Sequence, residues 1–212
     1  DRTVRLWDIP EARPLRTLEG HGETVSAVDA APDGTRVVSG SWDGTVRVWD
    51  LRRGVDARVL EGHEAQVTCV RFSSDGAAVA SGGWDGTVRI WEATGGEALC
   101  VLGPHEGNVT AVALHPNGRS VVSGAEDGTV RLWDPRARRV MRTLRGHQGE
   151  VSGLVFTPDG RFLVSSGRDR TVRLWDLRRG AGARALTLPE AVRAVALSPL
   201  GNRLLAAVAD DA

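Results

Sequence analysis

Histidine, serine and aspartate recur together along this chain of 212 residues. The histidines at 21, 63, 105 and 147 are separated by 42 residues each time. A serine, a histidine and an aspartate in one network are the working groups of many hydrolases, in which the histidine activates the serine hydroxyl. Several histidines can also bind a transition metal. These two chemistries are therefore the first ones to compare with the sequence.

The repetition argues against both chemistries. Catalysis needs one exposed set, whereas a set that recurs in every unit serves the structure of the unit. The G-x-S-x-G turn that presents the serine of one large hydrolase class is absent. Zinc ligands lie about 2 Å from a single ion, and histidines in successive units are too far apart to converge. No glycine-rich phosphate-binding pattern appears either. We therefore expect no catalytic residue, no metal and no cofactor.

The elements that position these residues are indicated by a second recurrence. Tryptophan followed by an acidic residue appears every 42 residues, as Trp7-Asp8, Trp49-Asp50, Trp91-Glu92, Trp133-Asp134 and Trp175-Asp176. A period of roughly 40–45 residues that ends in such a pair is typical of four-stranded propeller blades. The sequence therefore predicts one structural unit copied in tandem, with neighbouring units sharing a continuous core.

The unit at residues 20–61 shows how four strands arise. Pro32-Asp33-Gly34 and Asp43-Gly44 are turn signals, and the segment from Thr45 to Trp49 alternates with the period of two that a half-buried strand shows. Apolar runs before and between the turns complete the pattern. We predict antiparallel strands, from innermost to outermost, over 25–30, 36–41, 45–49 and 57–60.

The Gly-His pairs at 20–21, 62–63 and 146–147, the variant Gly103-Pro104-His105 and the five Trp-acid pairs resemble the WD40-repeat family over the whole chain. The resemblance implies an all-β propeller with four complete four-stranded antiparallel blades. The blades are expected at 20–61, 62–103, 104–145 and 146–187, between a half-blade at 1–19 and a degenerate half-blade at 188–212. In the last unit Leu188 replaces the expected histidine, Ala206 replaces the expected serine, and Asp210 is retained.

The family most often has seven blades, which would need about 290 residues at this period. We therefore expect the chain to be a fragment of a seven-bladed propeller. Closure with five blades, through pairing of the two terminal half-blades, is the alternative. Unpaired half-blades would leave open strand edges, through which the fragment could associate with itself.

The resemblance also implies a buried hydrogen-bonded tetrad in each complete blade. A satisfied polar network of this kind makes a blade rigid. The four sets are His21, Ser39, Asp43 and Trp49; His63, Ser81, Asp85 and Trp91; His105, Ser123, Asp127 and Trp133; and His147, Ser165, Asp169 and Trp175.

Two tryptophans, Trp42 and Trp84, lie outside the Trp-acid pairs, and the equivalent residues of the next blades are Glu126 and Arg168. Since these blades use charged residues there, structure does not require tryptophan. The family places this position at the rim of a face that often binds partners. The same rim is expected to include the residues three and five positions after each histidine: Thr24 and Ser26, Gln66 and Thr68, Asn108 and Thr110, and Glu150 and Ser152.

We therefore predict a non-enzymatic scaffold that presents this rim to a protein or peptide partner, within a larger signalling or regulatory protein. The formal net charge is zero, which argues against a nucleic-acid partner. The alternative is binding of nucleic acid or phosphoinositide by an equivalent arginine of each unit: Arg5, Arg47, Arg89, Arg131 and Arg173. A hydrolase in the central channel would have to use Asp29 and Arg71, which lie on different blades.

The composition suggests the setting. All 27 basic residues are arginine, which we attribute to a GC-rich and bacterial genome. No apolar run reaches the ~20 residues that span a bilayer, so no membrane partner is expected. Cys69 and Cys100 are expected on the innermost and outermost strands of one blade, too far apart for a disulfide. Two reduced thiols indicate a cytoplasmic protein.

Overall fold

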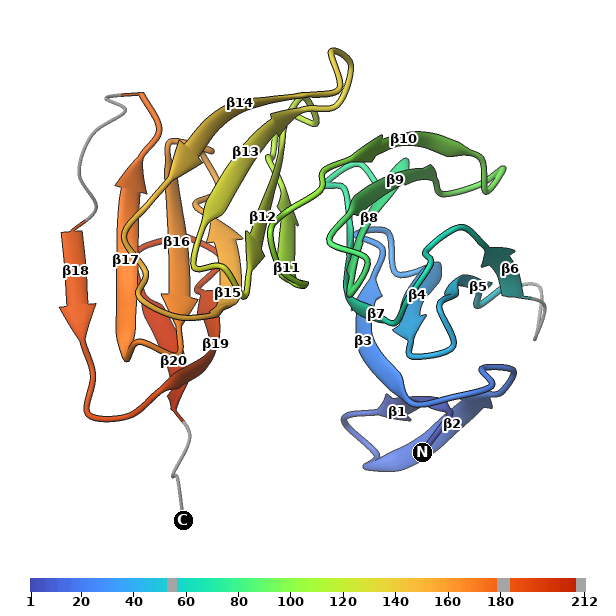
Figure 1. Cartoon of the computed structure of the whole chain (residues 1–212). Helices are drawn as coiled ribbons and strands as arrows, with labels where there is room; N and C mark the ends of the chain where they lie inside the picture. Colours follow the sequence, from blue (N-terminus) through green and yellow to red (C-terminus); the bar gives the residue numbers. More distant parts are fainter. Residues whose placement is uncertain (53–56, 179–183, 209–212) are drawn as a thin grey trace.

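The structure is a computed structural model that describes residues 1–52, 57–178 and 184–208. These residues form twenty strands, and every strand pairing among them is antiparallel. The strands build four sheets of four strands between two terminal sheets of two strands (Figure 1). The predicted all-β architecture, with four complete blades and a two-stranded sheet at each end, is thereby confirmed.

Each complete sheet is a meander whose strands follow in chain order. The first is β3 (Val25–Ala30), β4 (Arg36–Ser41), β5 (Val46–Asp50) and β6 (Ala57–Leu60). The second is β7 (Val67–Phe72), β8 (Ala78–Gly83), β9 (Val88–Glu92) and β10 (Ala98–Leu102). The third is β11 (Val109–Leu114), β12 (Val121–Ala125), β13 (Val130–Asp134) and β14 (Arg139–Leu144). The fourth is β15 (Val151–Phe156), β16 (Phe162–Gly167), β17 (Thr171–Asp176) and β18 (Arg184–Thr187).

The terminal sheets are smaller. One contains β1 (Val4–Asp8) and β2 (Arg13–Leu18), and the other contains β19 (Val192–Leu197) and β20 (Leu204–Val208). Within the described ranges these two sheets are not hydrogen-bonded to each other, so the five-bladed closure does not occur here. Leu188 packs beside the core of the last sheet, Ala206 is exposed, and Asp210 lies outside the described residues.

Short turns set the register within each sheet. After β3, the amide of Gly34 donates to the carbonyl of Ala31 at 2.9 Å, and Gly34 has a positive φ of 67°. The Asp33 carboxylate accepts hydrogen bonds from the amide and the hydroxyl of Thr35 at 2.9 and 2.8 Å. This aspartate caps the turn and fixes where the next strand begins. The Pro-Asp-Gly pattern therefore forms the connection that the sequence predicts.

Apolar residues fill the space between neighbouring sheets. The innermost strands β3, β7, β11, β15 and β19 lie side by side in series, and each sheet packs against the next (Figure 1). One core cluster joins Val38 and Val46 of the first sheet to Val70 and Trp91 of the second. The approach is close, because a β-carbon at Gly82 would lie 2.4 Å from Cγ1 of Val109 in the next sheet. Burial between sheets is thus what holds the series together.

The tryptophans of the Trp-acid pairs report on this packing. In the four complete sheets they are buried, whereas Trp7 is 53% exposed. Trp7 lies on β1, and β1 is paired only with β2 among the described residues. A complete sheet places a second strand on the other side of this position. The exposure of Trp7 follows from the smaller sheet.

Cys69 and Cys100 lie on β7 and β10, the innermost and outermost strands of the second sheet. Both are free and buried. Burial raises the pKa of Cys69 to about 11, so this thiol stays protonated at neutral pH. Among the described residues, no helix is long and apolar enough to cross a membrane.

Candidate partner-binding face

The structure brings the four members of each recurring set together. In the first complete sheet, Nδ1 of His21 lies 2.9 Å from Asp43, and Nε2 lies 2.8 Å from the Ser39 hydroxyl, to which Trp49 donates at 2.9 Å. The second set has the same contacts at 2.7, 2.8 and 2.8 Å, and the fourth at 3.0, 2.7 and 2.8 Å. The third set keeps the serine contacts, at 2.6 and 2.7 Å.

The bonding pattern fixes the protons. A carboxylate only accepts, so the proton of a neutral His63 ring lies on Nδ1, facing Asp85. Nε2 then accepts from Ser81, whose oxygen accepts from the indole N–H of Trp91. This order matches the hydrogen bonds of a hydrolase triad. The Ser81 oxygen is nevertheless fully buried and already bonded to an indole, so it offers no approach to a substrate.

The charges in these sets are held by hydrogen bonds. Burial opposes ionisation of Asp43, but bonds from Thr45, His21 and the Gly22 amide outweigh it and keep the pKa of Asp43 well below its usual range. Burial acts in the opposite direction on the imidazole of this set and lowers the pKa of His21 despite the nearby carboxylate. The set is therefore an ionised aspartate beside a neutral histidine at neutral pH.

The third set, which contains the Gly103-Pro104-His105 variant, is looser. Nδ1 of His105 is 3.5 Å from Asp127, beyond the 2.7–3.0 Å of the other sets. In those sets the amide that follows the histidine donates to the aspartate, whereas here one carboxylate oxygen of Asp127 is buried without a hydrogen-bond partner. Burial, with Arg131 nearby, lowers the pKa of His105 to about 4. The sequence variant thus costs this blade part of its network.

The recurring arginines lie over the same tryptophans. A β-carbon at Gly62 would lie 2.7 Å from Nη1 of Arg89 and 3.3 Å from the ring of Trp91. Gly20 and Gly146 stand in the same relation to their arginines, and Arg131 instead donates to the Pro104 carbonyl at 2.7 Å. These side chains are half-buried in the complete blades. In the complete blades, the arginines that the alternative hypothesis assigns to phosphate binding therefore lie beside the tryptophans and against the Gly-His loops.

Trp42 and Trp84 lie at the surface, where the resemblance places them. Their side chains are 49% and 47% exposed, and their ring centroids are 6.5 Å apart at an interplanar angle of 36°. Each is held from its own blade, because the amide of Trp42 donates to the Thr24 carbonyl and that of Trp84 to the Gln66 carbonyl, both at 2.9 Å. Two adjacent blades thus contribute to one exposed aromatic surface.

The positions equivalent to Trp42 and Trp84 in the next two blades have the same backbone hydrogen bond but carry charged side chains. The amide of Glu126 donates to the Asn108 carbonyl at 3.0 Å, and that of Arg168 to the Glu150 carbonyl at 2.9 Å. The Arg168 and Glu150 side chains also form an ion pair at 2.7 Å. The rim is therefore aromatic over the first two complete blades and charged over the next two.

The hydroxyl residues five positions after each histidine have a different environment from the one we expected. The Thr68 hydroxyl lies 3.0 Å from the Gly82 carbonyl of its own sheet and 2.5 Å from the Val109 carbonyl of the next. Its counterparts Ser26, Thr110 and Ser152 reach the next sheet in the same way, at 2.5, 2.6 and 2.5 Å. These hydroxyls fasten neighbouring blades and are already engaged. The presence of a serine or threonine at this position in every complete blade is the sequence pattern that indicates a structural role between blades.

Asp29 on β3 and Arg71 on β7, the two charged residues singled out on the inner strands, do not form a catalytic cluster. Asp29 accepts a hydrogen bond from the Phe72 amide at 2.8 Å and so joins β3 to β7. The Arg71 guanidinium donates to the carbonyl of its neighbour Val70 at 2.9 Å. No group of three metal-binding side chains occurs among residues 1–52, 57–178 and 184–208.

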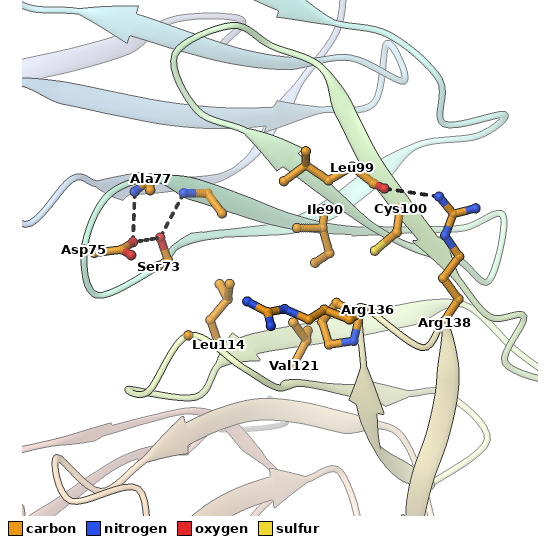
Figure 2. A pocket seen from close by; sticks show the side chains of 13 residues that line it. Ser73, Asp75, Ala77, Ile90, Leu99, Cys100, Leu114, Val121, Arg136 and Arg138 are labelled. Atoms are coloured by element: carbon orange, nitrogen blue, oxygen red, sulfur yellow. Dashed lines mark hydrogen bonds between the residues drawn. The ribbon is translucent and has the colours of Figure 1, made fainter.

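A cavity of 320 Å³ lies between the second and third complete sheets (Figure 2). Ile90, Leu114 and Val121 line it, and the Arg138 guanidinium reaches the Leu99 carbonyl across it at 3.5 Å. Asp75 is engaged in its own turn. Comparable hollows occur between the first and second sheets and beside the last terminal sheet, so these cavities follow the seams between blades.

The repeated sheets and their buried polar sets define a tandem-repeat propeller protein. The chain matches the WD40 family, described as WD domain, G-beta repeat, over residues 12–50, 54–92, 96–134 and 138–176. It belongs to this family, which is usually non-catalytic and typically acts as a scaffold for protein interactions. Each matched segment begins with the outermost strand of one sheet and continues through three strands of the next.

Similar curated proteins come from distant eukaryotes. The chain is 40% identical over 52 residues to the small ribosomal subunit protein RACK1 of Caenorhabditis elegans, covering 20% of this chain and 16% of that protein. It is 53% identical over 45 residues to a guanine nucleotide-binding protein subunit beta of Zea mays, covering 21% and 12%. Subunit beta-5b of Danio rerio is 42% identical over 43 residues, covering 20% and 11%. The alignments thus span a small part of each relative.

Proposed function

We propose that this chain is a non-enzymatic recognition module, which binds a protein or peptide through the rim that carries Trp42 and Trp84. One observation supports the proposal above the others: two tryptophans from different blades contact each other while half of each side chain is exposed. Tryptophan is among the residues that contribute most to protein interfaces. An exposed pair that no blade needs for its own folding is suited to an anchor for a partner.

The framework beneath the pair favours binding energetically. The neighbouring turn of Asp43 is held by Thr45 and His21, and that of Asp85 by Thr87 and His63. Because these turns are fixed before a partner arrives, little conformational entropy is lost when the complex forms. The proposed role of the tetrads is thus to keep the rim rigid, and the hydroxyl fasteners extend that rigidity from blade to blade.

The test compares partners captured by three versions of the 212-residue chain. The wild type, a Trp42→Ala/Trp84→Ala variant and a Leu99→Ala/Val101→Ala variant are immobilised, and bound proteins are quantified. Leu99 and Val101 are exposed apolar residues on the outer strand β10, so their removal is a matched control away from the rim. We expect at least tenfold loss of captured partners for the tryptophan variant and little change for the control. Equal capture by all three would refute the rim as the binding surface.

A further inference from the structure

The charge around the tryptophan pair indicates what kind of partner it takes. The Gly-His loops of the first two complete blades have the sequences Glu19-Gly-His-Gly-Glu23-Thr and Glu61-Gly-His-Glu64-Ala-Gln. All four glutamates in these loops are exposed, and none forms an ion pair with another described residue. The loops contain no arginine. The negative charge of these loops therefore has no ion-pair partner within the part of the chain that the structure describes.

These loops lie directly beside the aromatic rings. The loop of the second blade lies between the two tryptophans, since its Gln66 carbonyl accepts from the Trp84 amide, and Gly44 of the Trp42 turn approaches its His63 and Ala65 carbonyls. Glu64 belongs to this same loop. The loop of the first blade bonds to Trp42 through the Thr24 carbonyl. The glutamates and the indoles thus belong to one surface.

The basic groups next to these loops form no ion pair with the four glutamates and contact other parts of the loops. Arg47 and Arg89 are half-buried against Gly20 and Gly62, beside their tryptophans of the Trp-acid pairs. Arg2 reaches the Gly22 carbonyl at 3.3 Å. Asp43 and Asp85 remain ionised within their tetrads and add to the negative potential. On the opposite side of the rim, by contrast, Glu150 is neutralised by Arg168 at 2.7 Å.

From this arrangement we infer that the tryptophan pair receives an arginine or lysine side chain from an extended basic segment of a protein partner. This inference rests on the proposed function and specifies its ligand. An indole face attracts a cation, and a guanidinium stacks on it. The four unpaired glutamates supply the complementary charge and draw a basic segment toward the rim. An acidic segment would instead be repelled by these carboxylates. A wholly apolar segment would bury them without an opposite charge or hydrogen-bond donor, which is unfavourable.

The test is a selection from random twelve-residue peptides displayed on phage. The library is panned on the wild-type chain after removal of phage that bind the Trp42→Ala/Trp84→Ala variant. We expect the remaining peptides to be enriched in arginine or lysine at least threefold over the library. A synthetic version of the most enriched peptide should bind the Glu23→Gln/Glu64→Gln variant at least fivefold more weakly, and a Glu11→Gln variant, changed at an exposed glutamate outside the rim, with unchanged affinity.

The outcomes separate the two proposals. Peptides that depend on the tryptophans but are neutral or acidic would overturn the inferred basic ligand and leave the proposed rim standing. An enriched basic peptide whose affinity is unaffected by Glu23→Gln/Glu64→Gln would also overturn it, because the charge complementarity would be absent. If no peptide depends on the tryptophans, both the inferred ligand and the proposed function fail.

Discussion

Removing the Ser81 hydroxyl should destabilise the chain far more than the loss of one small atom suggests. In Ser81→Ala the indole N–H of Trp91 and Nε2 of His63 both lose a partner at 2.8 Å. Trp91 is 1% exposed, so water cannot replace the serine. A buried group left without its hydrogen bond costs about 1–3 kcal/mol. Two such groups predict a loss of about 2–6 kcal/mol, a large part of the ~5–15 kcal/mol that stabilises an ordinary domain.

The measurement is urea denaturation followed by far-ultraviolet circular dichroism, which does not depend on the emission of Trp91. Ser74→Ala is the matched control, because the Ser74 hydroxyl is exposed and makes a single bond to the Pro116 carbonyl at 2.9 Å. Its loss should change the free energy of unfolding by less than about 0.5 kcal/mol. Trp91→Phe, alone and combined with Ser81→Ala, measures the coupling, which we expect at about 1–2 kcal/mol. Equal effects of the two serine variants, or zero coupling, would refute the reasoning.

Three further predictions concern the same networks. Asp85→Asn should destabilise by about 1 kcal/mol more than Asp127→Asn in urea denaturation, since one Asp127 oxygen already lacks a partner; equal losses would contradict the difference between the sets. Acid should destabilise the fold between pH 6.5 and about 4. Over this range the unfolded chain takes up a proton at His105 and the folded chain does not, because burial lowers the pKa of His105 in the folded chain to about 4. His105→Gln should flatten this dependence of the free energy of unfolding on pH, and an unchanged slope would count against assigning the dependence to His105. Arg170→Gly should raise stability by about 1 kcal/mol in thermal unfolding, because Arg170 has a φ of 64° where three other blades have glycine; no gain would show that this φ is not costly.

Much of the fold could be predicted from the sequence, because every unit repeats the same local sequence patterns. The Asp-Gly turns, the alternation in residues 45–49 and the 42-residue spacing of Trp49 and Trp91 all indicate the same four strands. The relation between the two terminal sheets could not be predicted in this way. It depends on contacts between distant parts of the chain, and no local pattern encodes it.

The candidate site was only partly accessible to the same reasoning. The exposure of Trp42 was expected because its counterparts vary, but its contact with Trp84 depends on the rotation between adjacent blades, which a sequence does not specify. Thr68 was predicted to face a partner and instead fastens two blades. Variation between blades indicated that Trp42 is not required by the fold, and the presence of a hydroxyl residue at the Thr68 position in every complete blade indicates the opposite for Thr68. A residue type kept in every unit serves the unit, and one that varies between units is free to serve something else.

The sequence repeat and the sheet begin at different strands, and this offset has a consequence for how such genes change length. Each matched segment ends one sheet and begins the next, so it carries both sides of a junction. Unequal recombination that inserts or deletes 42 codons would therefore add or remove one such segment. In the product, the outermost strand of one sheet is still followed by an innermost strand that packs in the next sheet. Repeat number can drift by whole units without the need to evolve a new junction.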